Sequence, residues 1–263
     1  MLIKKLIKKL DLILFNGTLK RSYVRSRTKI SVRHHTQFLN HGFDVQYHKN
    51  DSSILNVLAD TYGSDKGEAS PESNPYSWPS HNYADFYGLV FGLRRNDIKN
   101  VIECGLGTNN PNLKSSMGID GKPGASLRMW RDFFPSANVI GCDIDKDILF
   151  SEERINTFCC DQTSSESINN FVKEAEIIEG SVDIIIDDGL HEYHAGISFF
   201  ENMIGCLRSD GIYIIEDVTH SDIFKYKSYF CENSSSFDAK FVYLKSPLRI
   251  WGDDNNLICI TRK

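Results

Sequence analysis

From residue 101 onward, short apolar runs alternate with amphipathic segments, and this alternation limits the folds open to the chain. The apolar runs are rich in valine and isoleucine, which favour strands, and the segments between them place apolar residues at helical spacing. We predict strands at 101–104, 138–142, 155–159, 182–187 and 211–216, and helices at about 125–134, 165–178 and 192–207. This pattern is typical of an α/β domain, in which helices cover both faces of a mostly parallel sheet. Two later candidate strands, 240–245 and 256–261, would complete one edge and bring the sheet to seven strands. Residues 51–95 also read as helical, interrupted by the loop at 63–67 and by the proline-rich stretch 70–80.

Charge is unevenly distributed along the chain, with the basic excess confined to the first 35 residues. Residues 1–35 contain ten Lys or Arg and one acidic residue, whereas residues 36–263 contain twenty Lys or Arg and thirty-four acidic residues. An acidic body is not typical of a nucleic-acid enzyme, so we expect no nucleic-acid partner. We expect a basic N-terminal extension over residues 1–50 and one α/β domain over residues 51–263, which is long enough to bury a sizeable core.

The N-terminal extension begins with a predicted amphipathic helix, since residues 2–14 place apolar side chains at helical spacing opposite a lysine-rich face. The segment has no continuous apolar core or cleavage site of a signal peptide, and no run in the chain reaches the ~18 apolar residues of a spanning helix. Seven cysteines without a C-x-x-C pair favour reduced thiols in a cytoplasmic protein. Two interpretations stay open: residues 1–33 contact an anionic membrane or partner, or the helix packs on the domain or on a second copy of the chain.

A glycine turn follows the first predicted strand, in Glu103-Cys-Gly105-Leu-Gly107. Glycines at such a turn let backbone N–H groups approach a ligand closely, and an acidic residue is expected about 20 positions later to bind ribose hydroxyls. Asp143 lies 38 residues after Gly105, but the polar stretch Thr108–Pro123 is sixteen residues long and has the composition of an inserted loop; without it the spacing is 22. The motif then resumes at Gly124-Ala-Ser126, which opens the next predicted helix.

The cofactor that fits this turn carries adenosine but no pyrophosphate. A dinucleotide requires a third glycine that brings a helix N-terminus onto the pyrophosphate, and the corresponding position here is Asn110. S-adenosylmethionine does not have this requirement. At the end of the third strand, Asp161 and Gln162 either hydrogen-bond an adenine edge or cap the helix that follows.

Two acidic pairs follow two consecutive strands: Asp187-Asp188, with His191 close behind, and Glu216-Asp217. Neighbouring strand residues point to opposite faces, so Asp187 and Asp188 are not both expected to reach a metal, and the other member of the pair is expected to have a structural or cofactor-side role. Carboxylates at strand ends are suitable ligands for Mg²⁺, and a histidine, with an unperturbed pKa near ~6.5, is a suitable base at neutral pH. His194 is a second candidate base, ranked below His191.

Together these residues resemble class I S-adenosylmethionine-dependent methyltransferases, and most of all the metal-dependent macrolide-sugar O-methyltransferases and their surface-polysaccharide relatives. The resemblance covers roughly residues 55–262 and implies a Rossmann-like fold. It depends on the order and spacing of several short motifs: Tyr62-Gly-Ser-Asp-Lys-Gly67, His81-Asn-Tyr83 with Tyr87, Glu103–Gly107, Gly124–Leu127 with Trp130, Gly141-Cys-Asp143, Asp161-Gln162, Asp187–His191 and Ile215-Glu-Asp217.

The resemblance implies roles for individual residues. Asp188, Glu216 and Asp217 would bind Mg²⁺, and His191 would be the general base. The cofactor-binding residues would be Glu103, Gly105, Gly107, Ser126, Asp143, Asp161, Gln162 and Asp187. The chain departs from the family in two ways: Leu190 stands where a small residue is usual, and the macrolide enzymes carry a separate N-terminal domain that has no counterpart here.

The sequence therefore predicts Mg²⁺-dependent methyl transfer from S-adenosylmethionine to a sugar hydroxyl, on a nucleotide-linked sugar or a surface polysaccharide. Two alternatives stay open: a phosphorus-containing or phenolic acceptor, and a non-catalytic module that binds an adenosine compound. Two further features have open interpretations. His81, Tyr83 and Tyr87 either close over the site or pack on the sheet, and Asp65 and Lys66 either cap or pair locally.

Overall fold

The computed structural model describes residues 51–263, except 71, 73, 77 and 246–253. The predicted N-terminal extension over residues 1–50, with its amphipathic helix, lies outside the described residues. Within them, no helix is long and apolar enough to cross a membrane.

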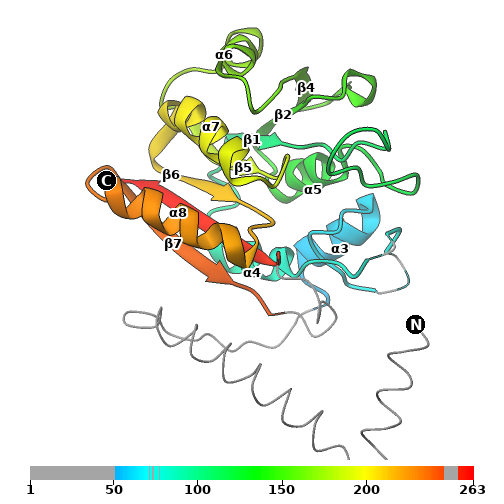
Figure 1. The fold of residues 1–263 in the computed structure, drawn as a ribbon. Coiled ribbons are helices and arrows are strands. Elements are labelled where there is room, and N and C mark those ends of the chain that lie inside the picture. Colours follow the sequence, from blue (N-terminus) through cyan, green and yellow to red (C-terminus); the bar gives the residue numbers. More distant parts are fainter. Residues whose placement is uncertain (1–50, 71, 73, 77, 246–253) are drawn as a thin grey trace, which may run out of the picture. The chain divides into compact units, whose positions relative to one another are not determined.

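One eight-stranded sheet organises the domain, in the order β3-β4-β2-β1-β5-β6-β8-β7 (Figure 1). The five strands from β4 to β6 are parallel to their neighbours, whereas β3, β7 and β8 pair antiparallel. The strands are β1 Asn100–Cys104, β2 Asn138–Asp143, β3 Ser151–Glu152, β4 Ile155–Cys159, β5 Val182–Asp187, β6 Leu207–Ile215, β7 Phe237–Tyr243 and β8 Asn256–Arg262. The predicted mostly parallel sheet is confirmed, and the two late strands do complete one edge. The additional strand is β3, whose two residues are too short to give an alternation pattern.

Helices cover both faces of this sheet. The α-helices are α3 Ile54–Tyr62, α4 Tyr83–Phe91, α5 Ala125–Phe133, α6 Ser165–Glu174, α7 Tyr193–Met203 and α8 His220–Glu232, and two short 3₁₀ helices span Lys146–Ile148 and Ile204–Cys206. Side chains of α3, α4 and α5 share one hydrophobic core with one face of the sheet, and side chains of α6, α7 and α8 share a second core with the other (Figure 1). Strand alternation explains the division: Val101 belongs to the first core and Ile102 to the second.

Helix α8 was not predicted. Its buried apolar residues are Ile223, Tyr226 and Phe230, one to each helical turn. The side chain of Thr219 caps the helix by accepting a hydrogen bond from the backbone N–H of Asp222 at 3.2 Å. A cap and a narrow apolar stripe are weak signals for a helix in a sequence. They are enough for a helix to form once its apolar side chains can pack on the sheet.

The predicted inserted loop is confirmed, because residues 105–124 contain neither helix nor strand. Helix α5 begins directly after Gly124, as the resumed motif predicts. Since the parallel strands β1, β2, β4, β5 and β6 end at the same edge, the predicted site residues come together there. This edge is where open α/β sheets bind ligands.

Candidate functional site

A cavity of about 410 Å³ lies at the carboxyl ends of the parallel strands. Its lining comes from the turn after β1, from the ends of β2, β4, β5 and β6, and from two long loops, within residues 64–83 and 107–122. The volume is in the ~300–1,000 Å³ range of small-molecule sites. Most of the predicted site residues line it.

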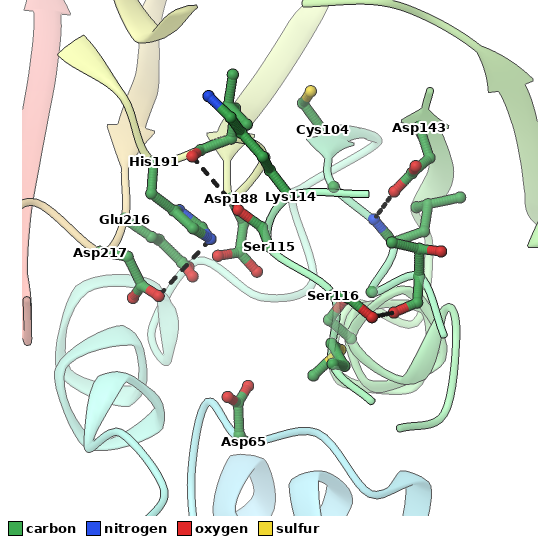
Figure 2. A pocket seen from close by; sticks show the side chains of 18 of the residues that line it. Asp65, Cys104, Lys114, Ser115, Ser116, Asp143, Asp188, His191, Glu216 and Asp217 are labelled. Carbon is green, nitrogen blue, oxygen red and sulfur yellow. Dashed lines mark hydrogen bonds and ion pairs between the residues drawn. The ribbon is translucent and has the colours of Figure 1, made fainter. Parts of the chain in front are cut away.

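The glycine turn after β1 forms one end of the cavity. Gly105 and Gly107 have φ angles of 93° and 80°, in the left-handed region that glycine adopts without strain. A Cβ atom on Gly105 would lie 2.0 Å from the backbone oxygen of Asp188. Asp143, at the end of β2, supports the turn by accepting a hydrogen bond from the N–H of Leu106 at 2.7 Å (Figure 2). These contacts bring backbone and a carboxylate to a surface where a ribose can bind.

The other predicted adenosine-side residues have different surroundings. Asp161 folds back on Thr163, accepting hydrogen bonds from its N–H at 2.9 Å and its hydroxyl at 2.6 Å, while Ser164 caps α6. Gln162 is buried, and its side-chain amide makes two hydrogen bonds. The amide nitrogen donates to Asp187 Oδ1 at 2.9 Å, and the amide oxygen accepts from the N–H of Leu190 at 2.6 Å. Gln162 therefore holds the Asp187–Leu190 turn in place, whichever group binds beside it.

Asp187 was predicted to bind the cofactor, but the structure places it elsewhere. It does not line the 410 Å³ cavity; it lines a much smaller pocket next to α7, beside Gly196 and Tyr226. The physical reason is strand alternation, which turns Asp187 and Asp188 to opposite sides at the end of β5. Burial raises the pKa of Asp187 to about 6. The structure is consistent only with the structural role foreseen for this residue.

Three of the predicted metal and base residues meet at the other end of the cavity. Ligand atoms of Asp188, His191 and Asp217 all lie within 4.8 Å of one another, and His191 Nε2 is 3.8 Å from Asp217 Oδ2 (Figure 2). His191 and Asp217 have positive φ angles, 58° and 53°. Such conformations are costly for residues other than glycine and are found most often at functional sites. At Asp217 the left-handed turn gives the sharp bend after β6 that its predicted role requires.

Lys66 lies among the carboxylates of this site, which sequence reasoning did not foresee. Its ammonium is 2.6 Å from Asp188 Oδ2 and 3.2 Å from Glu103 Oε1, and it also donates to Glu216 Oε2. The Lys66 side chain is 2% exposed, and those of Glu103 and Glu216 are 0% and 1% exposed. The expectation of local capping or pairing was therefore too narrow. Two signals in the sequence pointed to it: the motif Tyr62–Gly67, which contains Lys66, and the excess of carboxylates at strand ends, which requires a cation nearby.

Tyrosines of α4 hold the Glu216-Asp217 pair. Tyr87 donates its O–H to Glu216 Oε1, and Tyr83 donates to Asp217 Oδ1 at 2.6 Å. Both oxygens of Glu216 thus accept hydrogen bonds from protein groups, whereas Asp188 and Asp217 are partly exposed to the cavity. Tyr83 and Tyr87 thus pack on the sheet, as one interpretation predicted, and their hydroxyls also contact carboxylates of the site.

The carboxylates of the site fall into two groups, according to whether their pKa is raised or lowered. Burial raises the pKa of Glu103 to about 7, and it also raises the pKa of Asp188 and that of Glu216. Burial acts on Asp217 in the same direction, but His81, 3.5 Å away, and His191 outweigh it and lower its pKa to about 2. Asp217 is therefore the carboxylate most firmly held in its charged form.

Comparisons with known proteins agree with this geometry. The 8-demethyl-8-alpha-L-rhamnosyl tetracenomycin-C 2'-O-methyltransferase of Streptomyces olivaceus is 31% identical over 166 residues, covering 62% of this chain and 37% of that protein. The mycinamicin VI 2''-O-methyltransferase of Micromonospora griseorubida is 32% identical over 160 residues, covering 59% of this chain and 37% of that protein. The chain thus spans little more than a third of the length of these curated relatives. No protein-family model matches the chain.

A solved structure decides the fold. MycE, a methyltransferase from the mycinamycin biosynthetic pathway solved in complex with Mg and SAH, aligns with a TM-score of 0.56 and 24% identity over 82% of this chain and 55% of that chain. The chain has the class I methyltransferase fold. In this structure Gly105 lies at the glycine turn after β1 and Asp143 at the end of β2, and both line the cavity.

The residues that line the cavity suit both groups with which MycE was solved, Mg and SAH. Carboxylate oxygens of Asp188 and Asp217 are the hard donors that Mg²⁺ prefers, and both lie at the cavity surface. Gly105 and Gly107 line the cavity with positive φ angles and no side chain, so main-chain atoms there can approach a ligand closely.

Proposed function

We propose that this chain transfers a methyl group from S-adenosylmethionine to a hydroxyl of a sugar, with Mg²⁺ held beside the acceptor. The observation that carries the proposal is the meeting of Asp188, His191 and Asp217 in the same cavity as the glycine turn. A donor site and a site that activates a hydroxyl thus share one space of about 410 Å³. A module that only binds an adenosine compound has no need of the second site.

The chain's own residues have distinct tasks in this proposal. Asp188 and Asp217 would hold Mg²⁺, with Glu216 as the third predicted ligand, and the ion when bound would lower the pKa of an acceptor hydroxyl. In this structure the two carboxylate oxygens of Glu216 accept hydrogen bonds from Lys66 and Tyr87. For Glu216 to bind a metal, one of these oxygens must give up its hydrogen bond or bind the metal as well. Lys66, Tyr83 and Tyr87 fix the carboxylates and keep their mutual repulsion from opening the site.

His191 is the proposed general base. Nε2 faces Asp217, and Nδ1 is buried without a hydrogen-bond partner among the described residues. In the reaction the S–CH₃ bond of the donor breaks, an O–CH₃ bond forms, and the proton of the acceptor hydroxyl passes to the imidazole. Asp217 would stabilise the imidazolium that results.

The sugar acceptor is supported by the relatives, whose names describe methylation of a rhamnosyl group and of mycinamicin VI. We propose further that the sugar is part of a surface glycan or is nucleotide-linked, that the protein acts in the cytoplasm, and that residues 1–33 bring it to a membrane or to a second copy. The basic composition of residues 1–35 supports the membrane contact.

The test is methyl transfer from labelled S-adenosylmethionine to a panel of glycosides and sugar nucleotides, with Mg²⁺ or with EDTA. We expect transfer with Mg²⁺ and loss with EDTA that added Mg²⁺ reverses. Transfer undiminished by EDTA would contradict the metal role. If calorimetry detected no binding of S-adenosylmethionine or S-adenosylhomocysteine, the whole proposal would fail.

A further inference from the structure

Two stacked aromatic rings line the cavity and have no part in the proposed chemistry. Tyr76 and Trp78, in the loop before α4, have ring centroids 4.9 Å apart and planes inclined by 23°. Both rings line the same cavity as Asp188 and Asp217. Aromatic rings in a cavity wall provide large apolar faces at low cost in conformational entropy.

The polar edges of both rings are fixed by the loop at residues 63–65. Trp78 Nε1 donates to Asp65 Oδ2 at 3.0 Å, and the Tyr76 hydroxyl donates to the backbone oxygen of Gly63 at 2.6 Å. With their donors satisfied in this way, the rings are held in place and their faces are available to a ligand. Ordinary core packing does not explain the pair, because both rings are only partly buried.

Asp65 places a carboxylate on the same wall. Figure 2 shows its side chain pointing into the pocket, on the side opposite Asp188, His191 and Asp217. It precedes Lys66, whose ammonium is committed to Glu103, Asp188 and Glu216. Its oxygens have lone pairs beyond the one that accepts from Trp78, and these can accept further hydrogen bonds from hydroxyl donors.

The charge of the cavity restricts what can bind on this wall. Seven carboxylate side chains and three lysines line the cavity; the carboxylates are those of Asp65, Asp143, Asp161, Asp188, Glu216, Asp217 and Asp254. Two of the lysines are already paired, Lys66 as above and Lys114 with Glu192 at 2.6 Å. Lys122 lies over Gly63 at the edge of the wall. With Mg²⁺ and the sulfonium of the donor bound, the excess falls to one negative charge, and the carboxylate of Asp65 on the wall itself disfavours a phosphate or diphosphate next to it.

We infer that Asp65, Tyr76 and Trp78 form the sugar-binding wall of the acceptor site, and that the acceptor is an uncharged glycosyl unit. The inference depends on the proposed methyl transfer and deepens it. A sugar ring has an apolar C–H face, which packs on an aromatic ring, and hydroxyl donors at its edge, which suit a carboxylate. Stacking on Trp78 and a hydrogen bond to Asp65 would orient the ring with a hydroxyl toward Asp188 and His191.

The experiment compares acceptor kinetics of three variants. In Trp78→Leu the stacking face is lost, in Asp65→Asn one acceptor becomes a donor, and in Trp78→Phe the face is kept while the N–H is lost. The control is Phe224→Leu, because Phe224 lies on α8 and is 46% exposed. The acceptors are methyl α-L-rhamnopyranoside and thymidine-diphosphate rhamnose, and each variant is also titrated with S-adenosylhomocysteine.

We expect Trp78→Leu and Asp65→Asn to raise the acceptor KM about tenfold, with unchanged affinity for S-adenosylhomocysteine and a kcat within about twofold. Trp78→Phe should keep most of the affinity for the acceptor, which separates a lost stacking face from a misfolded loop. The glycoside should be methylated more efficiently than the sugar nucleotide. An unchanged acceptor KM in Trp78→Leu and Asp65→Asn, or a preference for the nucleotide, would overturn the inference.

Failure of the proposed function has a different signature, since the wild-type protein would then methylate neither acceptor. Saturation-transfer NMR with methyl α-L-rhamnopyranoside tests the wall without any turnover. We expect a signal from the ring protons of the sugar in the wild-type protein and in Phe224→Leu, and none in Trp78→Leu. Equal signals in all three proteins would overturn the inference.

Discussion

The ammonium of Lys66 lies 2.6 Å from Oδ2 of Asp188, a residue 122 positions later in the chain. This contact joins the loop after α3 to the end of β5 and brings a positive charge into a group of carboxylates that would otherwise repel one another. The ammonium is buried, and burial alone would lower its pKa, but Asp188, Glu216 and Glu103 together raise its pKa well above the usual value.

Replacing Lys66 with methionine should therefore destabilise the domain. The change leaves Glu103 and Glu216 buried without their cation, and breaking a buried ion pair in this way costs about 3–5 kcal/mol. Urea unfolding measures the free energy of unfolding. Lys114→Met is the matched control, because Lys114 is 72% exposed and its pair with Glu192 should contribute less than about 1 kcal/mol. Equal stability of Lys66→Met and wild type would show that the cluster needs no internal cation.

His191→Ala should reduce kcat for methyl transfer by about 10²–10⁴-fold, the usual contribution of a general base. Affinity for S-adenosylhomocysteine should not change, since the glycine turn is untouched. His194→Ala is the control: His194 is 66% exposed and pairs with Glu192, outside the acidic cluster. A larger loss in His194→Ala than in His191→Ala would reverse the assignment of the base.

Asp188→Asn should abolish the stabilisation of the protein by Mg²⁺, measured as the shift in Tm between EDTA and excess Mg²⁺. A ligand that binds only the folded state raises stability with its concentration, so losing a metal ligand removes the shift. Asp187→Asn should keep the shift, because Asp187 lies outside the large cavity although it is the neighbouring residue. Loss of the Mg²⁺ effect in both variants would contradict the division of this pair by strand alternation.

Gly105→Ala should prevent binding of S-adenosylhomocysteine in calorimetry. The new Cβ would meet the backbone oxygen of Asp188 at 2.0 Å, and backbone atoms there cannot give way without moving β5. Gly118→Ala is the control, because Gly118 also has a positive φ, 74°, but a Cβ added there would meet no atom within 4 Å. It should cost about 1–2 kcal/mol in backbone strain and leave ligand binding intact.

The stability of the wild-type protein relative to Lys227→Met should rise as the pH increases from 8 to about 10.4. Burial lowers the pKa of Lys227 to about 8. As the pH rises through 8 the folded state releases this proton, while the unfolded state keeps it until about pH 10.4, so the wild-type protein gains stability between these values. Thermal unfolding from pH 7 to pH 10.5 measures the difference. Lys240→Met, at a side chain that is 70% exposed, should show no comparable change in the difference across that range.

Local patterns in the sequence were enough to predict the strands, most of the helices and the loop between Gly107 and Gly124. Each depends on residues that are near one another in the chain: a run of valine and isoleucine, or a glycine after a strand. The acidic pairs could also be placed, because the strand that precedes each pair fixes where it ends. The separate directions of Asp187 and Asp188 followed from the two-residue repeat of a strand.

The tertiary structure alone decided which groups meet these carboxylates. Lys66, Tyr83 and Tyr87 reach Asp188, Asp217 and Glu216 from positions more than a hundred residues earlier, and a loop's path is not encoded in local periodicity. The same holds for Gln162, because the bond from its amide to Asp187, 25 residues later, could not be foreseen from either of the two roles left open for it, a contact to adenine or a helix cap. The sequence by itself determined the parallel sheet and the acidic edge of it, because both follow from short-range patterns. Only the folded chain places Lys66, the two tyrosines and the sugar-binding wall around these carboxylates, because long-range packing selects the partners of a buried charge.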